Sequence, residues 1–185
     1  MLVKEHSSEK YSQRTYHNAR TSQLTVAFAE DFNTAGERLT RKAAGEDKYV
    51  HFHLSESPLD VARKLYVVCK KRNIKKLNIA GNGIYTLKKK GWKQETINQW
   101  VYDVISLVHA HHGFDSIISG GQTGVDLAGA IAADACAVPH VEMTLPKGFL
   151  QRSIDNQEII QTERDVLAQV QFYLPKIVLK KIEKS

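Results

Sequence analysis

Short apolar segments alternate with longer helical segments along most of this chain, and this alternation constrains its fold most strongly. Five segments have the length and composition of buried strands: Leu24–Ala29, Tyr49–Leu54, Leu77–Ala80, Ser116–Ser119 and Pro139–Met143. Strands separated by helices form βαβ units, whose sheets are mostly parallel and covered on both faces. The sequence therefore predicts an α/β, Rossmann-like three-layer fold with a mostly parallel sheet of about five strands.

Amphipathic stretches fill the gaps between these strands. Apolar residues recur at helical spacing over residues 58–72, 94–112, 125–136 and 154–172, and a short helix is expected within residues 30–46. Pro58 suits the first turn of its helix, and Gly113 suits the end of the next one.

The 185 residues are enough for one α/β domain. We predict a flexible N-terminal arm over residues 1–23, a Rossmann-like domain over 24–175 and a basic tail over 176–185. No run of about 18 apolar residues is present, so no membrane partner is expected. Cys69 and Cys136 lie far apart in apolar contexts, which indicates free thiols and a cytoplasmic location.

The most informative segment is a glycine-rich turn between an apolar strand and an Ala-rich helix. Ser119-Gly120-Gly121-Gln122-Thr123-Gly124 follows Ile117 and Ile118 and precedes Val125-Asp126. Glycines let the backbone approach an anion, and the helix that follows directs free N–H groups and its positive end to the same place. This pattern predicts a phosphate-binding loop.

A simpler interpretation of the same turn is a tight strand–helix connection. Thr123 could cap the helix, and Thr123 with Asp126 has the spacing of a capping box. A second glycine turn, Gly81-Asn82-Gly83, also follows an apolar strand. If the two strands are neighbours, both turns face one crevice at the carboxyl ends of the strands.

Residues Ser119–Asp126, followed by Leu145-Pro146-Lys147-Gly148-Phe149, resemble the molybdenum-carrier proteins of the SLOG superfamily of Rossmann-like nucleotide-binding domains. The resemblance covers roughly residues 74–149. It implies that Gly120–Gly124 hold the phosphate of a nucleotide-like ligand and that Gly81–Gly83 form the first loop of the Rossmann core. It also implies that Lys147 approaches the ligand from a later strand end.

The superfamily also contains LOG-type phosphoribohydrolases, whose loop differs from this one. They carry a proline where this chain has Ser119, a Gly-Thr pair where it has Thr-Gly, and a downstream glutamate where Asp126 is the nearest acid. Their upstream catalytic arginine has no match in this sequence. Asp126 is thus our candidate catalytic residue, either as an acid/base or as a ligand of a ribose hydroxyl.

Other polar groups leave alternatives open. Asp31, Asn33, Glu37 and Arg38 follow the first predicted strand, where they either line the crevice or form a solvated loop. Histidines gather near residues 51–53 and 109–112, but we predict no metal site, because sequence does not bring them together with an acid.

Basic residues dominate the stretch from Lys70 to Lys93, which contains no acid, within a chain of net charge +6. Such a run attracts polyanions, so nucleic-acid binding is the competing class of function. It is also compatible with an ordinary solvated surface. Self-association stays open.

We therefore predict a protein that binds a nucleotide or a nucleotide-derived phosphorylated small molecule, with hydrolysis of a glycosidic or phosphoribosyl bond as the reaction it could catalyse. The cofactor is unknown. A non-catalytic sensor or sequestering protein fits the same residues.

Overall fold

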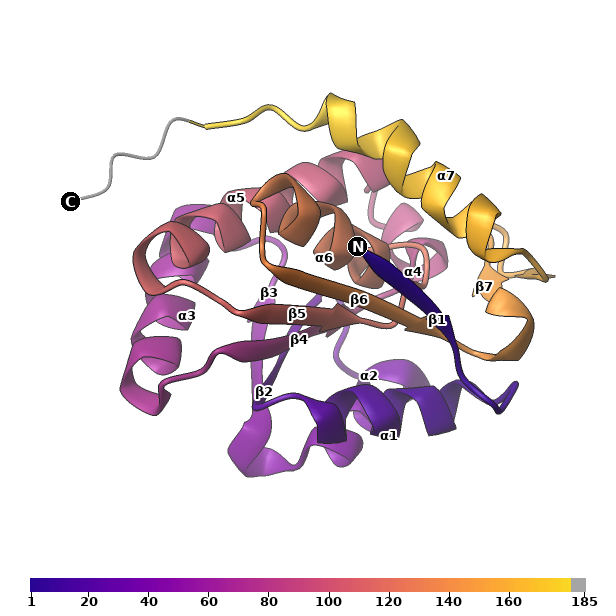
Figure 1. Cartoon of the computed structure of the whole chain (residues 1–185), viewed down its shortest axis with the longest axis horizontal. Helices are drawn as coiled ribbons and strands as arrows, with labels where there is room; N and C mark the ends of the chain where they lie inside the picture. The colour runs from indigo at the N-terminus through magenta and orange to yellow at the C-terminus, as the bar shows by residue number, and fades with distance from the viewer. Residues whose placement is uncertain (181–185) are drawn as a thin grey trace.

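The computed structural model describes residues 1–180 and contains a six-stranded parallel sheet between two layers of helices (Figure 1). The strands are β1 (Leu2–Glu5), β2 (Leu24–Ala29), β3 (Tyr49–His53), β4 (Lys76–Gly81), β5 (Ser116–Ser119) and β6 (His140–Leu145). Their order across the sheet is β1-β6-β5-β4-β2-β3. The predicted α/β three-layer class is confirmed, with one strand more than expected.

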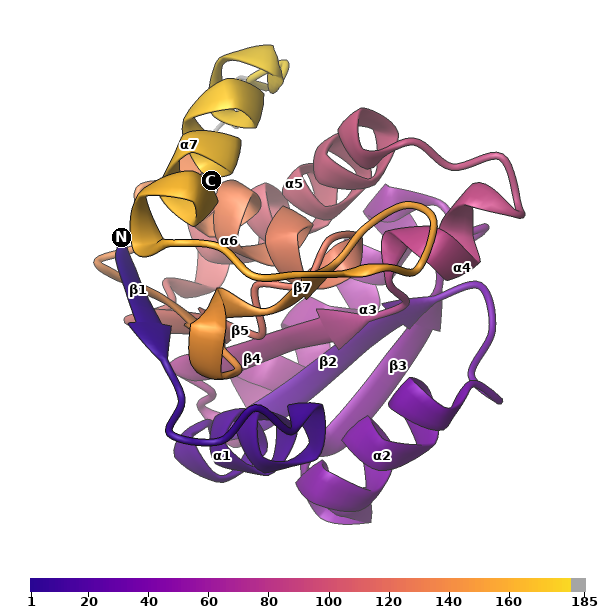
Figure 2. The same cartoon turned by 90° about the vertical axis from the view of Figure 1, so that its right-hand side faces the viewer.

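Helices and minor elements connect these strands. The helices are α1 (Tyr11–Thr21), α2 (Ala35–Ala44), α3 (Pro58–Arg72), α4 (Ile84–Lys88), α5 (Gln94–His112), α6 (Val125–Ala135) and α7 (Glu163–Tyr173). Minor elements are the 3₁₀ turns η1 (Glu46–Lys48), η2 (Lys147–Phe149) and η3 (Leu174–Lys176), and the hairpin strands β7 (Gln151–Arg152) and β8 (Glu158–Ile159). Helices α1 and α2 cover one face, and α3, α5, α6 and α7 lie on the other (Figures 1 and 2).

The core lies on both faces of β2 and under α6. All six residues of β2 are buried, as its apolar sequence predicts. Residues 125–133 of α6 are also buried, because this helix is enclosed between the sheet and α5. A Cβ on Gly129 would lie 2.8 Å from Ile79 Cγ2, so the small residues of α6 let it approach β4 closely.

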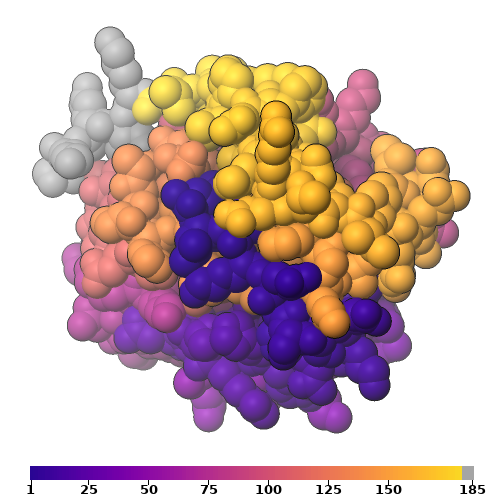
Figure 3. Space-filling view, turned by 45° about the vertical axis from the view of Figure 1, so that its right-hand side comes forward, coloured from indigo at the N-terminus to yellow at the C-terminus, as the bar shows by residue number. Residues whose placement is uncertain are grey.

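The N-terminal segment is not the flexible arm that its weak periodicity predicts. Residues 2–5 pair in parallel with β6, and α1 buries Arg14, Asn18 and Ala19. In the space-filling view the indigo N-terminal residues lie against the orange and yellow C-terminal third (Figure 3). The apolar signal was weak because β1 is a short edge strand with one buried residue, Val3.

Two further predictions need correction near the C-terminus. Residues 151–159 form the β7–β8 hairpin, so α7 starts at Glu163 rather than near Ile154. Thr162 caps α7 in a capping box with Asp165. Residues 181–185 of the predicted basic tail lie outside the described part of the chain.

Within residues 1–180, every helix is too short or too polar to cross a bilayer.

Substitution of Val3 tests whether β1 is part of the folded sheet. Val3 is 5% exposed and Leu2, on the opposite side of the strand, is 40% exposed. We expect Val3→Ala to lower the free energy of unfolding by about 1–2 kcal/mol through lost apolar burial, and Leu2→Ala to change it by less than about 0.5 kcal/mol. Equal effects in urea denaturation would contradict the assignment of β1 to the sheet.

Candidate functional site

A cavity of about 390 Å³ opens between α1, α2 and the carboxyl end of β4. From β2 the chain continues outward to β3, whereas from β4 it continues in the opposite direction to β5. The cavity thus lies at the point where the strand order reverses, which is where open α/β sheets bind ligands. Its lining comes from α1, the first turns of α2, the end of β4, the start of α4, and parts of residues 122–126 and 152–156.

One face of α1 supplies a polar wall. Tyr11, Arg14 and Asn18 follow one another at three- and four-residue spacing, so they share the face that borders the cavity. Arg14 and Asn18 are buried. Sequence reasoning missed all three because it placed them in an arm, although polar residues at this spacing are a signal of a polar helix face.

Arg14 reaches Asp126 at the N-terminal end of α6. Arg14 Nη1 lies 3.1 Å from Asp126 Oδ2, and the two side chains are 8% and 7% exposed. Burial raises the pKa of Asp126, while the Arg14 guanidinium and backbone hydrogen bonds from Gly81 and Gln122 oppose this shift. The predicted catalytic carboxyl therefore borders the cavity as half of a buried ion pair.

Glu37 is the second carboxyl of the cavity wall. It is 2% exposed, and its Oε1 accepts a hydrogen bond from Asn82 Nδ2 at 3.3 Å. Burial, followed by the nearby Asp126 and Asp31 carboxyls, raises its pKa to about 8. Of the polar cluster predicted after the first strand, Glu37 is thus a member that lines the crevice.

Several buried polar atoms around the cavity have no hydrogen-bond partner among residues 1–180. They are Tyr11 Oη, Arg14 Nε, both amide atoms of Asn18, and Glu37 Oε2. All four residues line the cavity. Because native proteins rarely leave buried polar groups unpaired, this wall has hydrogen-bonding capacity for a bound molecule or for ordered water.

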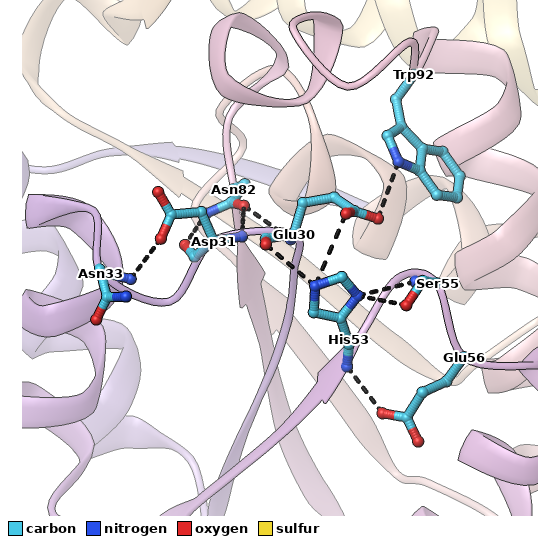
Figure 4. Close-up of polar contacts among 8 residues, drawn as sticks. All are labelled: Glu30, Asp31, Asn33, His53, Ser55, Glu56, Asn82 and Trp92. Carbon is cyan, nitrogen blue, oxygen red and sulfur yellow. Dashed lines mark hydrogen bonds and ion pairs between the residues drawn. The ribbon is translucent and has the colours of Figure 1, made fainter.

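Asn82, predicted as a ligand-binding residue, is held by the protein itself (Figure 4). Its Oδ1 accepts the backbone N–H groups of Glu30 at 2.9 Å and Asp31 at 3.0 Å, and its Nδ2 donates to the Asp31 carbonyl at 3.0 Å. In the same loop Glu30 accepts a hydrogen bond from Trp92 and contacts His53. Asn82 therefore shapes the loop after β2 and orients Glu37.

The two glycine turns meet, as predicted, because β4 and β5 are neighbours. Gly83 and Gly124 form an isolated bridge, with the Ile84 N–H donating to the Thr123 carbonyl and the Val125 N–H to the Asn82 carbonyl. Gly81 and Gly83 line the cavity with Asn82.

The backbone of Gly120–Gly124, however, is not the open anion cradle that the sequence predicts. The Gly121 N–H faces Ser119 Oγ at 3.4 Å, and the Gly124 N–H donates to Gln94 Oε1 at 2.7 Å. The backbone N–H of Gln122 donates a hydrogen bond to the Asp126 carboxylate. These N–H groups face side chains of the protein itself, from Ser119, from Gln94 of α5 and from Asp126 of α6. Of the residues 120–124, only Gln122 and Thr123 line the cavity.

The glycines of this loop serve close packing. A Cβ on Gly120 would lie 1.6 Å from Arg14 Nη1, and one on Gly121 would lie 2.7 Å from Leu145 Cδ1. The simpler helix-cap interpretation also needs correction, because the N-cap of α6 is Gly124 and the Thr123 hydroxyl donates to the Arg152 carbonyl. Ser119 is fully buried behind the loop.

Lys147 and the basic run lie elsewhere. Lys147 is exposed in η2 and does not line the cavity. The residues from Lys70 to Lys76 precede or begin β4, whereas those from Lys88 to Lys93 follow it. Six strand residues span roughly 20 Å, so the two halves of the basic run lie at opposite ends of β4. Lys88 pairs with Asp155, and Lys89 lies over the Tyr85 ring.

The strand order, the reversal point and the cavity define an α/β protein of the Rossmann-like type. A family model of the circularly permutated YpsA SLOG family matches residues 2–103, and the chain belongs to this family. The predicted superfamily is confirmed, and the finer likeness to molybdenum-carrier proteins stays a prediction. Searches of curated proteins and of solved structures found no match.

The matched segment explains the position of β1. This strand is first in the chain, yet it lies beside β6, the last strand of the sheet. Such an order results when the unit that would follow β6 is moved to the start of the chain. The match also includes Arg14, Asn18 and Glu37, which were absent from the segment that carried the resemblance.

Substitution of Gly124 tests the close approach of the two turns. A Cβ there would lie 2.5 Å from the Asn82 carbonyl oxygen, at a φ of 100°. Gly91 has a φ of 83° and open space around it, so it controls for backbone strain alone. We expect Gly124→Ala to cost about 1–3 kcal/mol more than Gly91→Ala in chemical denaturation. Indistinguishable losses would show that the turns are not tightly packed.

Glu37 makes stability depend on pH. Its pKa in the folded protein is raised to about 8. The stability that the protonated carboxyl contributes is therefore fully present below the pKa of the unfolded chain and is lost as pH rises through about 8. Glu37→Gln removes the ionisation, so the variant should gain stability relative to wild type, by a few kcal/mol, between about pH 5 and about pH 8. The exposed Glu9→Gln is the control, and a constant difference across this range would count against the buried carboxyl.

Proposed function

We propose that this protein binds a nucleotide-derived small molecule in the cavity between α1, α2 and β4. The observation that carries the proposal is the polar wall of Tyr11, Arg14, Asn18 and Glu37, whose unpartnered buried atoms all border one cavity. Membership of the SLOG family is compatible with a ligand related to nucleotides. The volume of about 390 Å³ falls in the range of small-molecule sites.

The residues proposed to bind the ligand differ from those that the sequence predicts. Gln122, Thr123 and the Gly81–Gly83 turn border the cavity, whereas Gly120, Gly121 and Gly124 support it from behind. In this proposal Asp126, which is paired with Arg14, holds α1 against α6 and presents the arginine to the cavity. Two of the side chains proposed to contact the ligand, Asn18 and Glu37, come from α1 and α2.

Hydrolysis of a glycosidic or phosphoribosyl bond is a second candidate. Two carboxyls, Glu37 and Asp126, border the cavity, and Glu37 has a pKa of about 8, which suits proton transfer near neutral pH. In that reaction the bond between the anomeric carbon of the sugar and its leaving group breaks, the water oxygen bonds to that carbon as a hydroxyl group, and a proton passes to the leaving group. Incubation with nucleosides and their monophosphates, followed by chromatography of free base, separates an enzyme from a sensor or sequestering protein.

Substitution of Asn18 tests ligand binding without loss of a side-chain hydrogen bond within the protein. Neither amide atom of Asn18 has a partner, so Asn18→Ala should fold normally and lose any thermal shift caused by a ligand. Ser116 Oγ is buried and unpartnered but lies outside the cavity, which makes Ser116→Ala the matched control.

The ligand panel consists of nucleosides, nucleoside mono- and diphosphates, cyclic nucleotides and ADP-ribose. At least one should raise the melting temperature of wild type and of Ser116→Ala, but not that of Asn18→Ala. A panel without any shift, or a full shift in Asn18→Ala, would contradict the proposal.

A further inference from the structure

A serine, a histidine and a glutamate form a chain of polar contacts on the loops that follow β2 and β3 (Figure 4). Ser55 Oγ lies 2.7 Å from His53 Nδ1. His53 Nε2 lies 3.1 Å from the carbonyl oxygen of Glu30 and 3.7 Å from its carboxylate Oε2. All three residues belong to the described part of the chain, and none of them lines the cavity between α1, α2 and β4. They therefore form a second cluster with its own chemistry.

The parallel pairing of β2 with β3 brings this cluster together. Ala29 lies opposite His53 in the register of the two strands, so Glu30, the next residue, comes to the side of the imidazole. The turn after β3 returns Ser55 to the same ring, and Glu56 fixes this turn by accepting the His53 backbone N–H at 2.9 Å. The three side chains are thus placed by a sheet register and a short turn.

The hydrogen bonds decide which nitrogen of His53 carries the proton. The backbone N–H of Ser55 donates to Nδ1 at 3.1 Å, and a ring nitrogen that accepts a hydrogen bond holds a lone pair and no proton. In the neutral ring the proton is then on Nε2, which donates it to the Glu30 carbonyl. The hydroxyl of Ser55 accordingly donates to Nδ1, so this nitrogen is placed to take the hydroxyl proton.

Glu30 orients the ring and places a negative charge beside it. Its carboxylate is held by the indole of Trp92, whose Nε1 donates to Oε1 at 3.1 Å, and its side chain is 13% exposed. The second oxygen, Oε2, faces Nε2 and stabilises the imidazolium that forms when His53 takes a proton. Because Glu30 acts through His53, it is a positioning residue. Ser55 is exposed, so a molecule in solution reaches its hydroxyl.

The start of α3 lies three residues after Ser55 along the chain and carries a partial positive charge. This 15-residue helix begins at Pro58, and its N-cap residue Ser57 makes no side-chain cap. The N–H groups of the first turn also have no partner within the helix. Asp60 of this turn is paired with Arg63 at 3.3 Å, which offsets its charge. Free N–H groups at a helix start stabilise the negative charge that develops on a carbonyl oxygen under attack.

We propose that Ser55 is a nucleophile activated by His53, and that this cluster cleaves carboxylic esters, independently of the proposed function. A nucleophile, a base and a group that orients the base, each within reach of the next, are the signature of such a site. Ser55 Oγ bonds to the ester carbonyl carbon while its proton passes to Nδ1. The bond from this carbon to the alcohol oxygen then breaks, and the alcohol leaves with that proton. Water next bonds to the acyl carbon, the acid leaves, and a proton returns to Oγ.

Covalent labelling of the wild-type protein tests the nucleophile. An alkyl fluorophosphonate should phosphonylate Ser55 with loss of fluoride, and peptide mass spectrometry locates the label. His53→Gln should slow this labelling by about 100-fold. His51→Gln is the matched control, because His51 is exposed on the same strand, and it should be labelled like wild type. An unlabelled Ser55 in wild type, or equal labelling in His53→Gln, would overturn the proposal.

Hydrolysis of p-nitrophenyl acetate tests the ester class. Wild type should release nitrophenol at least about tenfold faster than Ser55→Ala. Ser57→Ala removes a neighbouring hydroxyl that makes no cap bond, so its rate should match that of wild type. Equal rates in wild type and Ser55→Ala would overturn the assignment of esters as substrates.

Two further variants separate a catalytic arrangement from a structural one. In Ser55→Cys the imidazole should take the thiol proton, so iodoacetamide should alkylate this thiol at least about tenfold faster than that of Ser57→Cys. Equal alkylation of the two thiols would overturn the role of His53 as a base. Glu30→Gln keeps an oxygen for Trp92 Nε1 but loses the charge beside the imidazole. The pH of half-maximal labelling should therefore fall by about one unit, and an unchanged profile would overturn the positioning role.

Discussion

The buried ion pair between Arg14 and Asp126 is the interaction on which the rest of this structure depends. It joins α1, at the start of the chain, to the first turn of α6, at the centre of the fold. Removing one partner from such a pair typically costs about 3–5 kcal/mol, because the other charge stays buried and unpaired. The pair thus couples the position of the N-terminal unit to the integrity of the core.

This ion pair also accounts for the glycine turn. Gly120 has no room for a Cβ because the guanidinium and the carboxylate meet over its Cα. The backbone N–H of Gln122, which would otherwise be available to an external anion, donates to the Asp126 carboxylate. The loop does bind a negative charge at the start of a helix, but the charge belongs to the protein. Glycine at such a turn therefore reports a close approach and does not identify the approaching group.

The cavity results from the same geometry. Because α1 is held against α6, its polar face borders a space that α2 and the end of β4 complete. Asn82 fixes the loop between β2 and α2, and so sets where Glu37 stands. Fold, cavity and polar wall thus depend on a few side chains that bond across distant parts of the chain.

Local pattern predicted the elements that have strong local signals. The apolar run of β2, the strand of β5 and the long helices α3 and α5 are placed by sequence within the bounds that the structure has. Their signals are local because burial on both faces, or on one helical stripe, imposes a period on neighbouring residues. Short β1 buries a single residue and carries no such period, so its place was not predicted.

What sequence alone determined is the α/β class, the SLOG likeness and the presence of two glycine turns at neighbouring strand ends. The tertiary structure alone decided that β1 and α1 close the sheet, that Arg14 occupies the turn, and that Asn18 and Glu37 face one cavity. The physical reason is sequence separation: Arg14 and Asp126 are 112 residues apart, and no local pattern records which charge a buried side chain will meet.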